Sequence, residues 1–161
     1  RIEELEQFAL NDSMTGFYNR NAYDYFIYNE KNIKNYMVVT FDLNNLKMCN
    51  DNYGHSSGDA YIIHSAHIIE TTFDRFGKCY RIGGDEFCCL IPDAAEFQIE
   101  RFIQKMQQDI AILNNKNIIP TEVGIACGYA AATPDDADIE KVRERADEMM
   151  YHNKKVLKGL I

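Results

Sequence analysis

Two acidic sites interrupt segments that otherwise have the composition of buried strands, and these acids are the side chains best suited to chemistry. Asp42 stands at the end of a β-branched and aromatic run, and Asp85 and Glu86 stand between Gly83-Gly84 and a second apolar run. If the two runs lie side by side in one sheet, Asp42 and Asp85 meet at one of its edges. Converging carboxylates repel each other unless a proton or a cation lies between them. Mg²⁺ prefers oxygen ligands at about 2.1 Å, so the sequence predicts a magnesium site there.

The Gly-Gly pair next to these acids allows two interpretations. Gly83 and Gly84 permit backbone angles that other residues resist, and they remove side chains where a bulky ligand must come close. Alternatively, the pair only makes a tight turn and the neighbouring acids are solvated. An isolated Gly-Gly-Asp-Glu string favours this second interpretation, whereas the rest of the chain favours a binding site.

The segment from Asp42 to Asp59 is dense in polar side chains. Lys47 is suited to meet a phosphate as a point charge. Asn50 and Asp59 offer the acceptors that the N1–H and N2–H₂ groups of guanine require. Taken with the acids, the segment predicts a site for a nucleotide bound together with Mg²⁺.

The length and the charge of the chain restrict its partners. The 161 residues suit one domain. The formal net charge of −8 argues against non-specific binding to nucleic acid or to an anionic membrane. A nucleotide carried as its Mg²⁺ complex is still compatible, because the metal offsets the like-charge repulsion. We therefore expect no nucleic-acid partner and no direct membrane contact.

The cysteines and the apolar runs indicate a compartment. The five cysteines are an odd number without regular spacing, and the longest apolar runs are too short for a signal peptide or a membrane span. These features favour a reducing, cytoplasmic setting. Because the chain opens with Arg1 rather than Met, we expect a piece of a longer protein, such as the cytoplasmic portion of a larger sensor.

Hydrophobic spacing predicts the order helix, strand, helix, hairpin, helix, strand, helix. The expected strands cover residues 36–43, 79–82, 86–91 and 121–129. The expected helices are the end of an upstream helix over residues 1–10, helices over 21–30 and 58–73, a stripe from Ile99 to Leu113, and a last helix that is capped by Asp136 or Asp138 and buries Ile139, Val142, Ala146 and Met149. The sequence therefore predicts an α/β (α+β) sandwich in which helices flank a mainly antiparallel central sheet.

Four segments of the chain resemble the motifs of the GGDEF family, in the order in which the family carries them. They are residues 12–20 (DSMTGFYNR), 50–59 (NDNYGHSSGD), 81–87 (RIGGDEF) and 146–154 (ADEMMYHNK). The resemblance covers nearly the whole chain, from about Asp12 to Lys158. It implies a fold similar to nucleotidyl cyclases and polymerase palms, with residues 1–10 as the end of a linker or signalling helix and residues 11–161 as the catalytic domain.

The resemblance also implies roles around a metal. Asp42 and Asp85 would bind Mg²⁺ through their carboxylates and Leu43 through its backbone carbonyl, with Mn²⁺ as an alternative ion. Asp85 would also help to deprotonate an attacking 3′-hydroxyl. Glu86 would support the metal site, and Lys47 would stabilise charge on the phosphates.

Further residues would bind the substrate. Asn50 and Asp59 would read guanine, and Lys154 and Lys158 would hold the terminal phosphates. The position of Lys158 is often arginine in the family. The residues at the turn complete this set of substrate contacts: Arg81, Gly83 and Gly84.

The implied reaction is a diguanylate cyclase reaction, in which two GTP molecules give cyclic di-GMP and two pyrophosphates. Each domain would bind one GTP, so the expected partner is a second GGDEF domain in a transient or stable homodimer, with an upstream sensor domain in the full-length protein. One alternative is a catalytically silent GGDEF domain that acts as a GTP-binding sensor or an interaction module. Another is a cyclase that also accepts ATP, and Asp59 argues against it.

Four positions depart from the family pattern. Many members carry an Arg-x-x-Asp product-inhibition motif before the glycines, and this chain has Asp74 and Gly77 in those two places. We therefore expect no strong feedback inhibition through that surface. Asn44 replaces a common aspartate and Leu46 a common phenylalanine. Because the carboxylates of Asp42 and Asp85 are present, we expect activity to survive these changes.

Overall fold

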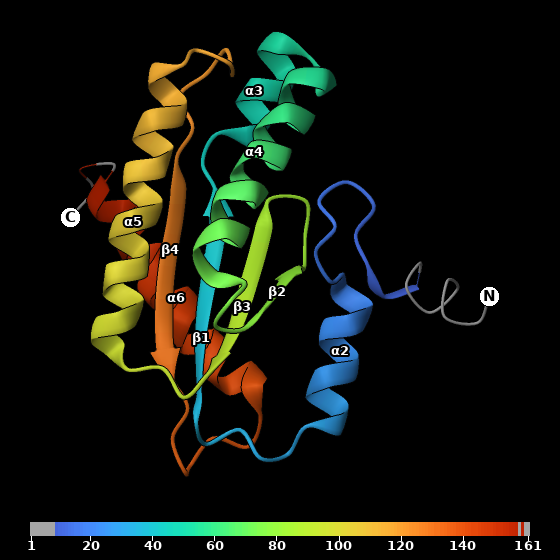
Figure 1. Cartoon of the computed structure of the whole chain (residues 1–161), viewed down its shortest axis with the longest axis vertical. Coiled ribbons are helices and arrows are strands. Elements are labelled where there is room, and N and C mark those ends of the chain that lie inside the picture. The colour runs from blue at the N-terminus through green and yellow to red at the C-terminus, as the bar shows by residue number, and fades with distance from the viewer. Residues whose placement is uncertain (1–8, 158, 160–161) are drawn as a thin grey trace.

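The computed structural model describes residues 9–157 and residue 159 (Figure 1). Most of the helix expected over residues 1–10 therefore lies outside the described residues, and so does Lys158. In the described part of the chain, no helix is both long enough and apolar enough to cross a bilayer.

A four-stranded sheet forms the centre of the molecule, with the strand order β2-β3-β1-β4 (Figure 1). Its strands are β1 (Tyr36–Leu43), β2 (Lys78–Arg81), β3 (Glu86–Pro92) and β4 (Ile125–Ala131). All three strand pairings are antiparallel, which confirms the expected sheet. The bounds of β1 match the expectation, and β2 and β3 form the hairpin expected around the Gly-Gly pair.

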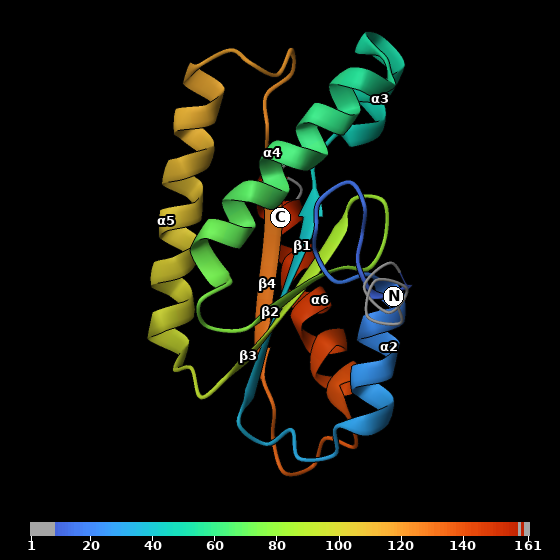
Figure 2. The same ribbon diagram turned by 45° about the vertical axis from the view of Figure 1, so that its right-hand side comes forward.

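Helices cover both faces of the sheet, as expected (Figure 2). They are α2 (Arg20–Asn29), α3 (Leu46–Tyr53), α4 (His55–Phe73), α5 (Glu96–Asn115) and α6 (Ile139–Leu157). The helices α4 and α5 pack on the face that carries Val39 and Phe41, whereas α2 and α6 pack on the face that carries Val38. The strand β1 is apolar almost throughout because it has a hydrophobic layer on each side.

The last strand begins later than expected, at Ile125 rather than at residue 121. Gly124 explains the difference, since its N–H donates to the hydroxyl of Tyr61 at 2.9 Å and its carbonyl accepts from the N–H of Asn44 at 2.8 Å. The backbone of Gly124 is therefore hydrogen-bonded to a loop residue and to a side chain. Pairing with β1 begins only at Ile125.

The polar segment after β1 forms two helices where the sequence suggested only a connection before residue 58. The helix α3 buries Leu46 and Cys49, and two apolar positions are too few to reveal a helical period. Asn45 and Gly54 flank this helix with positive φ angles of 59° and 90°. The left-handed backbone at these residues allows β1, α3 and α4 to follow one another almost without loops.

The helix α6 packs directly against the backbone of β4. A Cβ atom on Gly128 would lie 2.3 Å from the carbonyl oxygen of Ala146 and 2.4 Å from the amide nitrogen of Met150, so only glycine permits this approach. Of the two methionines on its sheet-facing side, Met150 is buried, whereas Met149 is half-buried and its sulfur accepts the N–H of Tyr129 at 3.4 Å. Of the two expected caps, Asp138 accepts the N–H of Lys141 at 3.3 Å.

Candidate metal and nucleotide site

The two acids that the sequence singled out meet at one edge of the sheet. Asp42 lies opposite Glu86 in the register of β1 and β3. One residue further, the N–H of Leu43 donates to the carbonyl of Asp85 at 3.0 Å. The strand pairing thus continues into the Gly-Gly turn and keeps Asp85 beside Asp42.

The electrostatics of this edge favour a positive charge. Burial raises the pKa of Asp85, and the adjacent carboxylate of Asp42 raises it further. The Oδ1 atom of Asp42 is buried and has no hydrogen-bond partner among the described residues. A buried acceptor without a partner costs about 1–3 kcal/mol, and a cation at this point would remove the cost.

The side chains at this edge fit a magnesium ion that is shared with a substrate. Among the described residues, no group of three or more His, Cys, Asp and Glu side chains is arranged to hold a metal. Mg²⁺ usually takes one or two carboxylates together with substrate phosphates rather than a cage made only of protein. Asp42, Asp85 and the nearby backbone of Leu43 supply a donor set of that kind.

The last helix brings an ammonium group to the same carboxylates. The Nζ atom of Lys154 lies 2.7 Å from Oδ2 of Asp42, and both side chains are largely buried. The resemblance implied that Lys154 holds a phosphate, and in the structure it pairs with an acid of the expected metal site. Two carboxylates and one ammonium leave a net negative charge at this edge, which favours the binding of a cation.

Arg81 braces the Gly-Gly turn through contacts within the protein. Its Nη2 donates to the carbonyl of Gly84 at 2.8 Å, and its Nη1 lies 3.2 Å from the carboxylate of Asp12. Thr15 donates both its N–H and its hydroxyl to Asp12, at 2.9 and 2.7 Å. Burial raises the pKa of Asp12, but the hydrogen bonds from Thr15 and the charge of Arg81 outweigh it, so the pKa is lowered.

The residues expected to read guanine lie at the junction of α3 and α4. Asn50 is half-buried, and a Cβ atom on Gly58 would overlap its side-chain oxygen, at 1.7 Å. Asp59 follows Gly58 directly and is exposed. The absence of a side chain at Gly58 therefore leaves the space that the side chain of Asn50 occupies. Lys47 is exposed on the first turn of α3 and forms no ion pair within the described chain.

Sequence reasoning missed two groups that hold this site in place. One is the pair Asp12 and Thr15, which stood in a recognised motif without a role. The other is Tyr61, a fully buried residue whose hydroxyl donates to the carbonyl of Asn44 at 2.6 Å and accepts from Gly124. Burial raises the pKa of Tyr61 to about 12. Nothing in the sequence marked Tyr61, and only the fold shows that its hydroxyl holds the loop after Asp42 in place.

Comparison with known proteins identifies the family of this chain. The family model described as "Diguanylate cyclase, GGDEF domain" matches residues 9–158, so the chain belongs to the GGDEF family. It is 31% identical over 157 residues to diguanylate cyclase DgcN of Escherichia coli, covering 94% of this chain and 38% of DgcN. It is 27% identical over 163 residues to diguanylate cyclase DgcS of Shewanella oneidensis, covering 96% of this chain and 52% of DgcS. The chain thus spans about half or less of these relatives.

A solved structure shares the fold. The coiled coil and GGDEF domain of DgcB from Caulobacter crescentus, solved in complex with c-di-GMP, superposes with a TM-score of 0.84 at 23% identity. The match covers 96% of this chain and 85% of the DgcB chain. The sandwich with its antiparallel sheet is therefore the GGDEF fold.

Asp12→Asn is expected to lower the free energy of unfolding by about 1–2 kcal/mol at pH 7, because it weakens the contacts to Thr15 and Arg81. The folded-state pKa of Asp12 is lowered, so its stabilisation is fully present above the unfolded value of about 3.9 and is lost as the pH falls through the folded-state pKa. Urea unfolding from pH 7 to pH 3 should show the difference between parent and variant shrinking. Asp135→Asn, in an exposed loop, is the control. A difference that is the same at every pH would contradict this.

Lys154→Met is expected to lower the free energy of unfolding at pH 7 by about 1–3 kcal/mol, since it leaves Asp42 and Asp85 together without a cation. Added Mg²⁺ should stabilise this variant more than the parent. Lys155→Met, at the exposed neighbouring position of α6, is the matched control and should behave like the parent. Equal stability of the two variants would show that the ion pair contributes nothing.

Proposed function

We propose that this chain is the catalytic domain of a diguanylate cyclase, which condenses two GTP molecules into cyclic di-GMP and two pyrophosphates. The observation that carries the proposal is the meeting of Asp42 and Asp85 at the sheet edge, where a buried carboxylate oxygen has no hydrogen-bond partner among the described residues. The likeness to two diguanylate cyclases along nearly the whole chain supports it.

The metal site of this proposal uses Asp42, Asp85 and the backbone carbonyl of Leu43. A bound Mg²⁺, or Mn²⁺ in its place, would lower the pKa of the attacking hydroxyl and neutralise charge on the phosphates. The raised pKa of Asp85 suits it to accept a proton from the 3′-hydroxyl. Glu86 is exposed beside Gly83 and would support the metal site.

The substrate would lie between the Gly-Gly turn and the junction of α3 and α4. Arg81 fixes the turn through Gly84, so that the phosphates can approach a backbone without side chains. The phosphate charges would fall to Lys47 and Lys154, and to Lys158 outside the described residues. Lys154 would exchange its contact with Asp42 for one with phosphate as the metal binds. Guanine would be read by Asn50 and Asp59.

The reaction requires two copies of the domain. One chain offers one such set of residues, whereas the product joins two GTP molecules, so two domains must face each other as a homodimer. In the longer protein, an upstream sensor domain would set this arrangement. That assembly is part of the proposal.

A silent GGDEF domain that senses GTP or binds a partner is the rival function. Such a domain can bind GTP with Mg²⁺, but it needs neither Asp85 to accept a proton nor Lys47 to stabilise charge during phosphoryl transfer. The chain has Asp42, Asp85, Glu86 and Lys47. Their presence therefore favours the cyclase.

The test is GTP turnover with Mg²⁺ at high protein concentration, with the product identified by mass spectrometry. We expect cyclic di-GMP from the parent and at least about 10²-fold less from Asp85→Ala, because losing a metal ligand costs at least as much as losing a residue that orients one. Asp135→Ala, remote from the site, is the control and should keep full activity. ATP in place of GTP should give no cyclic product.

One outcome would decide against the cyclase, and another would decide against the role proposed for Asp85. Mg²⁺-dependent GTP binding without product, even when the chains are forced to dimerise, would establish the silent rival. Full activity of Asp85→Ala would show that the reaction does not depend on Asp85.

Added cyclic di-GMP is expected to leave the initial rate unchanged. Asp74 brings a negative charge where the inhibition motif has arginine. A Cβ atom on Gly77 would lie 2.2 Å from the carbonyl oxygen of Leu90, so the backbone of β3 leaves no room there for an aspartate. Initial rates at rising product concentration measure this. Saturable inhibition that Arg75→Ala relieves would show that this surface binds product by other residues.

A further inference from the structure

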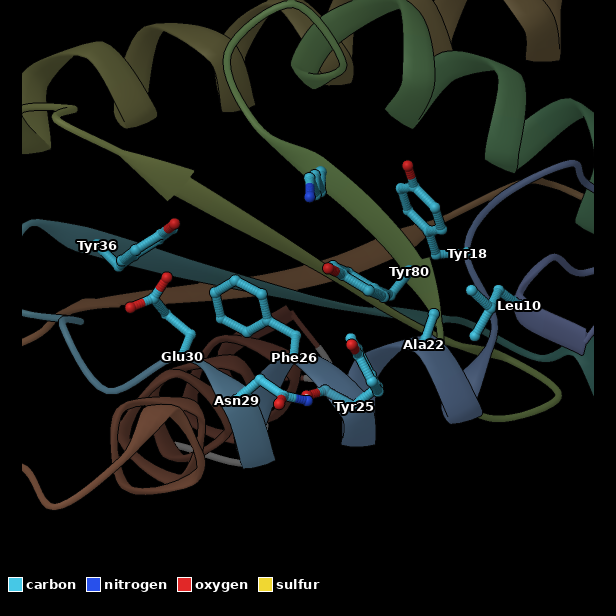
Figure 3. A pocket seen from close by; sticks show the side chains of 10 residues that line it. Leu10, Tyr18, Ala22, Tyr25, Phe26, Asn29, Glu30, Tyr36 and Tyr80 are labelled. Carbon is cyan, nitrogen blue, oxygen red and sulfur yellow. The ribbon is translucent and has the colours of Figure 1, made fainter. Parts of the chain in front are cut away.

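A cavity of about 430 Å³ lies between α2 and the edge strand β2, apart from the carboxylate site (Figure 3). Half of the ten residues that line it are aromatic, with Tyr18, Phe26, Tyr36 and Tyr80 among them. Phe26 and Tyr36 meet edge to face at 5.6 Å, and Tyr18 and Tyr80 lie 5.4 Å apart. Cavities that hold small ligands have volumes of about 300–1,000 Å³ and mostly apolar walls with a few polar groups. This cavity has both properties.

The hydroxyl of Tyr80 is a polar group within the cavity that a ligand can contact. Only 2% of this residue is exposed, and its oxygen is the part that stays accessible, without a hydrogen bond in the described part of the chain. Figure 3 shows it directed into the cavity, toward Phe26. A few polar groups in an otherwise apolar wall are what orient a ligand in such cavities. A polar group of a bound molecule would form a hydrogen bond with this hydroxyl.

Two side chains of opposite charge also line the cavity, and they do not form an ion pair with each other. Glu30 lies beside Tyr36 at one end, and its charge helps burial to raise the pKa of Tyr36. Lys78 also lines the cavity, with its ammonium 5.9 Å from the ring centre of Tyr18. Neither residue forms an ion pair within residues 9–157, and the carboxylate of Glu30 accepts only the backbone N–H of Asn32, at 2.8 Å. The walls thus present an acid and a base among aromatic side chains.

We propose that this cavity binds a small zwitterion with a flat apolar body, of which the aromatic α-amino acids are the simplest. The ammonium of the ligand pairs with Glu30 and lies over the tyrosine rings, as cations do on aromatic faces. Its carboxylate accepts from Lys78 and from the hydroxyl of Tyr80. Its ring packs against Phe26. A ligand with a single charge would leave either Glu30 or Lys78 without a partner.

L-Tryptophan is a direct probe, because the chain contains no tryptophan. Its fluorescence anisotropy is measured at constant concentration while the whole chain is titrated in. We expect a saturable rise. With the parent protein alone, tryptamine, which lacks the carboxylate, and indole-3-propionate, which lacks the ammonium, should each bind at least about tenfold more weakly than tryptophan.

Three substitutions test whether tryptophan binds in this cavity. Glu30→Gln, Lys78→Met and Tyr80→Phe should each weaken tryptophan binding, the two charge changes by about tenfold. Lys34→Met and Tyr28→Phe alter exposed residues outside the cavity and should bind like the parent. No saturable signal for tryptophan, or equal binding of tryptamine or indole-3-propionate, would overturn the proposal. Unchanged binding by Glu30→Gln and Lys78→Met would do the same.

Discussion

The candidate site depends on the pairing of β1 with β3, which holds two carboxylates together against their repulsion. Two unit charges about 4 Å apart repel by about 1 kcal/mol in water and about 4 kcal/mol near a protein surface. The same pairing buries Phe41 opposite Phe87, and each such side chain contributes about 1.5–3 kcal/mol. The apolar layers on the two faces of the sheet therefore outweigh the repulsion at its edge. The hydrogen bond from Leu43 to Asp85 then prevents the turn from moving away.

The position of the Lys154 ammonium beside these carboxylates depends on a glycine of the neighbouring strand β4. Gly128 lets α6 lie against the backbone of β4, and the last turns of the same helix carry Lys154 to Asp42. A larger residue at 128 would displace the helix and with it the ammonium. The glycine is thus part of the electrostatics of the site although it touches no charged group.

Elements with long hydrophobic patterns could be predicted from the sequence. Short elements and individual contacts between side chains could not. The apolar run of β1, the hairpin and the stripe of α5 each involve many residues, so their elements followed directly. The helix α3 has two buried positions and escaped notice. The meeting of Asp42 and Asp85 followed from one assumption about strand order. The pairing of Lys154 with Asp42 could not be foreseen, because it depends on how closely α6 approaches the sheet.

The strand β2 joins the carboxylate site to the aromatic cavity. Tyr18 donates its N–H to the carbonyl of Cys79 and accepts the N–H of Arg81, at 3.2 and 2.8 Å, while its ring lines the cavity. Arg81 in turn holds Gly84 in the turn beside Asp85. Because side chains alternate along a strand, Tyr80 faces the layer of α2 and α6, whereas Cys79 faces that of α4 and α5. One short edge strand, with the backbone of Tyr18 beside it, therefore fixes the geometry of both regions.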